Sequence, residues 1–170
     1  MQLPFWSSDL FESTEGFALV TRDVSLTYSE LNHMVNEYAA HLEEFDLKNQ
    51  VAFLPMKMNI FSVVRYLACL RESIVPLLLP PHIDESLMQN LYEMYKPALS
   101  FGLDGLHDTE LHSMSVSNVG LPKNLAVLLN TSGSTGSAKL VKLSHDNLHQ
   151  NAKAICEYLK VDFRDKAHCS

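Results

Sequence analysis

Residues 125–143 read LAVLLNTSGSTGSAKLVKL, a hydroxyl- and glycine-rich loop between two apolar runs. Five of the first seven loop residues carry a hydroxyl, the other two are glycine, and the loop closes on Lys139. Small residues allow several backbone N–H groups to point at one anion, hydroxyls add donors, and lysine adds a positive charge. This combination suits a site that holds a polyphosphate.

A flexible linker is the alternative interpretation of a Ser/Gly run, and composition alone does not separate the two. The flanks favour a site, because they are apolar, contain the β-branched residues Val127 and Val141, and are not extended by any polar tract. We therefore predict a tight turn between two buried strands, with the loop at residues 131–139 as an anion site.

The spacing within the loop excludes three familiar motifs. A Walker loop has its lysine directly after the second glycine and then Ser or Thr, whereas Ser137 and Ala138 separate Gly136 from Lys139. A dinucleotide fingerprint needs three glycines, and the loop has two. A Ser-x-x-Lys pair is excluded because position 136 is glycine. The loop is a different kind of phosphate site.

The composition is that of an ordinary globular protein. At 170 residues the chain is most simply one domain, with 46% apolar and 19% charged residues and a net charge of −7. Lysine and arginine are scattered and form no basic face, so we expect no nucleic-acid partner.

The termini and the cysteines indicate a cytoplasmic protein. Residues 1–6 contain no basic region followed by an apolar stretch, and no window approaches the roughly 18 apolar residues of a membrane span. The three cysteines Cys69, Cys156 and Cys169 are an odd number at wide spacing. Cys69 and Cys156 fall on apolar helical faces, so we interpret them as small core residues in a reducing compartment.

Strand and helix signals alternate along the chain. Thr27 and Glu30 form a capping box at the start of the first long helix, and Asp84 and Ser144 can cap later ones. In the last helix, Leu148, Ala152, Ile155 and Leu159 recur at helical spacing and are expected to face the core. Residues 102–122 carry no assignable signal. The predicted strands are 17–20, 51–54, 74–79, 98–101 and 125–130, and the predicted helices are 28–45, 59–71, 85–95 and 145–159.

This alternation predicts an α/β fold with a mainly parallel sheet and helices on both faces. Ligands of such sheets bind beyond the carboxyl ends of the strands, which is where residues 131–139 fall. His145 and His149 are four apart on one predicted helix and could face a common metal. No third ligand is placed to complete that site, so we predict an exposed helix start and no metal.

The loop resembles the signature Ser/Thr-Ser-Gly-Ser/Thr-Thr-Gly-x-Pro-Lys of the acyl-adenylate-forming superfamily, also called AMP-dependent synthetases and ligases. Residues 131–139 match at every position except Ala138, where proline is usual, and Leu140 replaces a usual glycine. Residues 26–32, 70–80 and 141–148 are weaker similarities that extend the resemblance over most of the chain. The superfamily includes acyl-CoA synthetases, adenylation domains of peptide synthetases and beetle luciferases.

The resemblance implies a ligase that converts ATP and a carboxylic acid, such as a fatty acid, into an acyl-adenylate and pyrophosphate. A thiol of coenzyme A or of a carrier protein then accepts the acyl group. Mg²⁺ would bridge the phosphates. The residues implied to hold the β- and γ-phosphates are Thr131, Ser132, Gly133, Ser134, Thr135, Gly136 and Lys139.

Members of this superfamily are far longer than 170 residues, and their segments for adenine, ribose, the acid and the catalytic lysine lie further along the chain. We therefore expect residues 1–170 to be a single incomplete domain, the amino-terminal portion of the large ligase domain, without catalytic residues or activity of its own. Uncovered apolar surface should favour self-association. The alternative is a non-catalytic α/β module that binds an anion or a partner.

Overall fold

The computed structural model describes residues 4–103, 105–112, 121–130, 140–162 and 165–167. The predicted elements are present with boundaries that differ by one or two residues. The helices are α1 (Ser8–Glu12), α2 (Tyr28–Glu43), α3 (Ile60–Arg71), α4 (Glu85–Tyr95) and α5 (His145–Leu159). The strands are β1 (Phe17–Val20), β2 (Ser25–Thr27), β3 (Val51–Pro55), β4 (Val75–Leu79), β5 (Leu99–Phe101), β6 (Thr109–Leu111), β7 (Leu125–Asn130) and β8 (Leu140–Ser144).

The main sheet has six strands in the order β6-β5-β3-β4-β7-β8. The four central strands run parallel, and the two edge strands, β6 and β8, pair antiparallel to their neighbours. β1 and β2 form a separate antiparallel hairpin. The prediction of a mainly parallel α/β sheet is confirmed.

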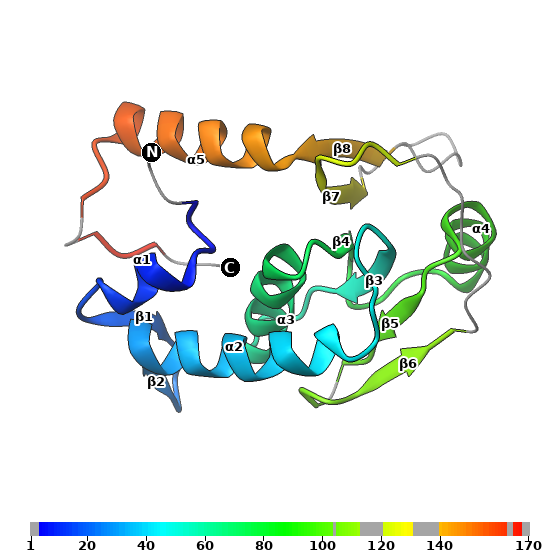
Figure 1. The fold of residues 1–170 in the computed structure, drawn as a ribbon, viewed down its shortest axis with the longest axis horizontal. Coiled ribbons are helices and arrows are strands. Elements are labelled where there is room, and N and C mark those ends of the chain that lie inside the picture. The colour runs from blue at the N-terminus through cyan, green and yellow to red at the C-terminus, as the bar shows by residue number, and fades with distance from the viewer. Residues whose placement is uncertain (1–3, 104, 113–120, 131–139, 163–164, 168–170) are drawn as a thin grey trace.

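Helices cover both faces of this sheet, as Figure 1 shows for α3 and α4 on opposite sides of the central strands. Side chains alternate between the faces along each strand. Ala52 and Leu54 of β3 join the core beneath α2 and α3, whereas Val51 and Phe53 join a second core with α4. Because both faces of β3 and β4 are buried, these strands read in sequence as continuous apolar runs.

The central strand β4 tolerates Pro76 because the proline nitrogen faces a stretch where β4 has no hydrogen-bonded neighbour. Val75 donates its N–H to the carbonyl of Gln50 on the β3 side, at 2.9 Å. The nitrogen of the next residue, Pro76, therefore faces β7. Pairing between β4 and β7 begins only at Leu77, so the missing N–H of Pro76 costs no ladder hydrogen bond.

The helices begin where the sequence places their caps. Thr27 and Glu30 form the predicted capping box of α2, and Ser144 forms a second box with Asn147 at the start of α5. Asp84 accepts hydrogen bonds from the backbone of the first turn of α4. These caps satisfy N–H groups that have no partner within the helix.

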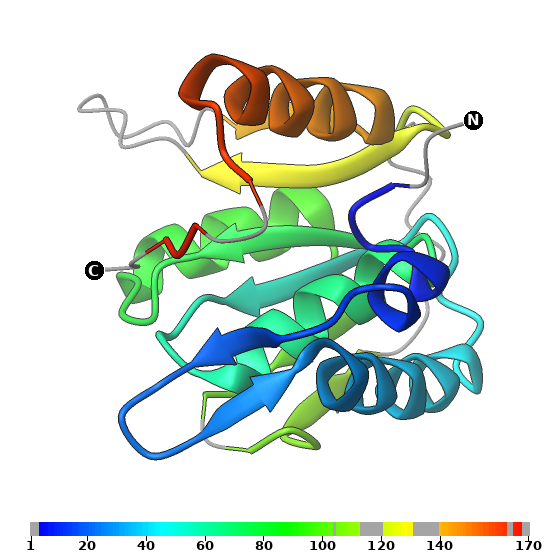
Figure 2. The same ribbon diagram turned by 90° about the vertical axis from the view of Figure 1, so that its left-hand side faces the viewer.

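Two expectations about burial are wrong, and both concern the carboxyl-terminal third of the chain. β8 is an edge strand with Val141 40% exposed, so the loop does not join two buried strands. No side chain of α5 is buried: Ile155 is 47% and Leu159 is 61% exposed. α5 lies along the β7–β8 hairpin (Figure 2), which leaves Leu148 and Ala152 half-buried and Ile155 and Leu159 exposed.

The predicted burial of the cysteines is likewise right in the central helix α3 and wrong in α5. Cys69 on α3 is fully buried, as predicted, and burial raises the pKa of its thiol. Cys156 on α5 is exposed, which contradicts its interpretation as a core residue. Cys169 lies outside the described residues.

Arg65 is the one arginine that the fold buries among the described residues, with 1% of its surface exposed. From α3 it donates to the carbonyls of Gly102 (2.6 Å), Leu106 (3.3 Å), Asp108 (3.1 Å) and Gly105. The planar guanidinium presents five N–H donors, which suits a loop of converging carbonyls. Arg65 thereby fixes the connection that leads from β5 into β6, a strand that the sequence patterns did not reveal.

Replacing this guanidinium should destabilise the chain strongly. In Arg65→Met, several carbonyls of the loop at residues 102–108 lose their donors, and we expect the free energy of unfolding to fall by about 3 kcal/mol or more. Urea denaturation followed by circular dichroism measures this change. The matched control is Arg22→Met, whose exposed side chain should change stability by less than about 0.5 kcal/mol. Equal stability of the two variants would contradict the role of Arg65.

The uncovered side of α5 should promote self-association of the chain. Ile155, Tyr158 and Leu159 are 47%, 87% and 61% exposed, and the neighbouring β8 is an unpaired sheet edge. Light scattering should therefore detect species larger than a monomer as concentration rises, and Ile155→Glu should shift the distribution toward monomer. A clean monomer at high concentration would refute this expectation.

Candidate functional site

Three parallel strands end at one edge of the sheet. β3 ends at Pro55, β4 at Leu79 and β7 at Asn130, and their arrowheads point the same way in Figure 2. We call this the carboxyl edge. It is where ligands of open α/β sheets bind.

The β7–β8 hairpin brings both ends of the predicted phosphate loop to this edge. Asn130 and Leu140 are direct partners in the antiparallel register. The Cα atoms of such partners lie about 4.5–5.5 Å apart. Residues 131–139 therefore leave and re-enter the sheet at adjoining positions, as a strand–loop–strand arrangement requires and a tether between separate domains does not.

The loop itself lies outside the described residues. The phosphate-binding roles of its members accordingly stay predictions. These residues are Thr131, Ser132, Gly133, Ser134, Thr135, Gly136 and Lys139.

Two helices also begin at the carboxyl edge, and side chains cap both. The Oδ1 atom of Asn59 accepts the N–H of Ser62 at 2.9 Å in α3. In α4, the Ser86 hydroxyl and the backbone N–H groups of Leu87 and Ser86 hold the pKa of Asp84 below its usual range. Side-chain acceptors therefore already take up one or two of the first N–H groups of each helix.

The segment after β3 adds a lysine to the edge. Met56 continues the ladder by donating its N–H to the carbonyl of Leu79 at 2.8 Å, and the Lys57 N–H donates to Ser62 Oγ at 3.0 Å. Met56 packs against the core, where a flexible methionine can fill an irregular gap. Met58, on the other side of Lys57, is 68% exposed.

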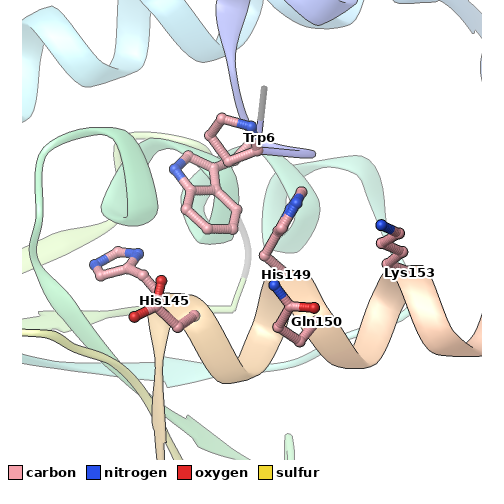
Figure 3. Close-up of a pocket in the computed structure, with 7 residues that line it drawn as sticks. Trp6, His145, His149, Gln150 and Lys153 are labelled. Atoms are coloured by element: carbon pink, nitrogen blue, oxygen red, sulfur yellow. The ribbon is translucent and has the colours of Figure 1, made fainter. Parts of the chain in front are cut away.

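His145 and His149 lie at the other end of the hairpin and line an open pocket with Trp6 (Figure 3). The rings of Trp6 and His145 are 5.2 Å apart between centroids, and burial lowers the pKa of His145. The prediction of an exposed helix start therefore holds only in part, because both histidines are partly buried whereas Asp146 and Asn147 are exposed. Sequence patterns missed this pocket because its two walls are far apart along the chain.

Two further features are absent from the part of the chain that the structure describes. No three His, Cys, Asp or Glu side chains in these ranges are grouped so that they could hold a metal ion. None of the described helices combines the length and apolar character needed to cross a membrane.

The six-stranded, mostly parallel sheet and its flanking helices match part of the large domain of adenylate-forming ligases. The family described as AMP-binding enzyme matches residues 12–169. The chain therefore belongs to the AMP-binding enzyme family.

Curated relatives are distant and very long. The chain is 28% identical over 181 aligned residues to malpinin synthetase of Mortierella alpina, covering 88% of this chain and 2% of that protein. It is 26% identical to a nonribosomal peptide synthetase of Gibberella zeae, covering 87% of this chain and 2% of the relative. The chain thus spans a small part of each.

Solved structures show the same fold at low identity. O-succinylbenzoate coenzyme A synthetase from Bacillus subtilis in complex with AMP superimposes with a TM-score of 0.77 at 18% identity, covering 96% of this chain and 48% of that one. VinN in complex with L-aspartate gives a TM-score of 0.75 at 18% identity, with 93% and 53% coverage. The chain spans about half the length of these structures.

Proposed function

We propose that this chain is the phosphate-binding part of an enzyme that uses ATP to activate a carboxylic acid as its acyl-adenylate. One observation carries the proposal. In a member of the AMP-binding enzyme family, a loop of hydroxyls, glycines and Lys139 closes a hairpin at the carboxyl edge of a parallel sheet.

The chemistry explains why such a loop is useful. A carboxylate oxygen attacks the α-phosphorus of ATP, the bond from that phosphorus to the bridging oxygen breaks, and pyrophosphate leaves with the bond's electrons. Negative charge accumulates on the departing phosphates. Preorganised N–H, hydroxyl and ammonium donors around those oxygens stabilise the charge where it develops.

A thiol completes the proposed reaction. The thiolate of coenzyme A or of a carrier protein attacks the acyl carbon, and AMP leaves with the electrons of the acyl–phosphate bond. The names of the relatives include both a peptide synthetase and a coenzyme A synthetase, so they support either acceptor. We propose a cytoplasmic location, which the free thiols of Cys69 and Cys156 support.

We include Mg²⁺ in the proposal only as the ion that would accompany the phosphates of ATP. The described residues contain no cluster of metal-binding side chains, so no ligand set and no step is assigned to the metal. Residues 1–170 on this proposal form the amino-terminal portion of the ligase domain, and their activity depends on the remaining segments that position both reactants.

Exchange kinetics test the role of the loop in a protein that joins this chain to the remaining ligase segments. We expect Lys139→Ala to lower carboxylate-dependent ATP–pyrophosphate exchange at least about tenfold, or about 1.4 kcal/mol of barrier, because charge on the departing phosphates loses a partner. Short, long and aromatic carboxylates should be compared in the same assay to identify the acid.

Lys142→Ala is the matched control, because Lys142 is an exposed lysine on β8 that the proposal leaves outside the loop. Its exchange rate should equal that of the unaltered protein. If Lys139→Ala behaves like this control, the lysine has no part in phosphate binding. Absence of exchange with every acid would favour a non-catalytic anion-binding module.

A further inference from the structure

A second pocket lies away from the carboxyl edge, between the amino-terminal segment and the first turns of α5. Its volume is about 480 Å³, and it is open to solvent. Pro4 and Trp6 form one wall. The other wall is a stripe along α5, and Figure 3 shows the Trp6 ring directed toward that helix. The α5 residues are His145, Asp146, His149, Gln150 and Lys153.

Trp6 is held in place by contacts outside the pocket. Its carbonyl accepts the Nε–H of Arg71 at 2.8 Å, and Phe5 packs edge-on against its ring at 4.8 Å between centroids. On the pocket side, the ring lies 5.2 Å from His145. A fixed indole surface of this kind favours a planar aromatic ligand, which can stack at little entropic cost.

The charged side chains of this stripe have opposite signs at its two ends. Asp146 and Lys153 are seven positions apart, or about 10 Å along the helix axis. His149 lies between them, on the same side of the helix as Lys153. The ion pair of Lys153 with Glu157 is long, at 3.8 Å, and exposed, so it holds the ammonium weakly. A carboxylate is therefore attracted to the Lys153 end and repelled from the Asp146 end.

We propose that this pocket binds an aromatic carboxylate, with its ring against Trp6 and its carboxylate at His149 and Lys153. Asp146 fixes the orientation by repelling the anionic end. Gln150 can donate an amide N–H to the same carboxylate.

The site is distinct from the proposed ATP loop. His145 donates its N–H to the carbonyl of Asn124, so α5 begins where β7 begins. The six residues of β7 separate the His145 end of the pocket from the carboxyl edge by about 20 Å, and Lys153 lies about 12 Å along α5 from that end. The pocket also lies on a different side of α5 from Ile155 and Leu159, because successive helical residues turn by about 100°.

Trp6 is the single tryptophan of the chain, so its fluorescence reports on this pocket alone. The full 170-residue chain is titrated with benzoate at neutral pH, with excitation selective for tryptophan. We expect a saturable change with a Kd of about 1 mM or tighter. Cyclohexanecarboxylate, which has the charge without the flat ring, should bind at least about threefold more weakly.

Charge variants make the test specific. Lys153→Gln should weaken benzoate binding at least about threefold, and Asp146→Asn should strengthen it. Lys142→Gln makes the same charge change on β8, away from the pocket, and should leave the Kd unchanged. Quenching that never saturates, or equal Kd values for Lys153→Gln and Lys142→Gln, would overturn the proposal. ATP–pyrophosphate exchange does not enter this readout, so either proposal can fail without the other.

Discussion

Parallel pairing of β3, β4 and β7 is the constraint on which the rest of the structure depends. The registers Phe53↔Leu77 and Leu77↔Leu128 align the three strands side by side. With a strand spacing of about 4.8 Å, their carboxyl ends form one edge. The three segments that follow these strands therefore begin side by side. They are Met56 and Lys57 after β3, the turn into α4 after β4, and the loop after β7. Pairing of β7 with β8 then returns the loop to the same place.

Much of this architecture could be predicted from sequence because local signals and tertiary structure agree. The runs at Val51–Pro55 and Val75–Leu79 are apolar throughout because helices bury both of their faces. Thr27, Asp84 and Ser144 cap helices with their own side chains, which is a local interaction that needs no distant partner.

The failures have a common physical cause. Helical periodicity shows which side of α5 is apolar, but it does not report whether another element covers that side, and Ile155 and Leu159 are exposed. The strand β6 has three residues, which is too few for an alternating hydrophobic pattern to be recognised. Its position depends on the hydrogen bonds from Arg65 to carbonyls between Gly102 and Asp108. The pocket formed by Trp6 and His145 is likewise a tertiary contact that no local pattern contains.

On the proposed function, the identity of the acid is a separate question from the phosphate chemistry. Hydroxyls, glycines and Lys139 suit phosphate oxygens, which are the same whatever acid is activated. The chain therefore carries the signature of the family without specifying a substrate. The Trp6 pocket begins beside the first residues of β7, and its lining continues along α5 from His145 to Lys153.

The most direct test of the central claim is amide NMR of the ¹⁵N-labelled chain during titration with tripolyphosphate. If residues 131–139 hold phosphate oxygens, their backbone amides should shift in a saturable manner, together with those of Asn130 and Leu140. Amides around Trp6 and in α5 should stay in place. Shifts confined to the α5 pocket, or no saturable shift in residues 131–139, would contradict the assignment of this loop as the phosphate site.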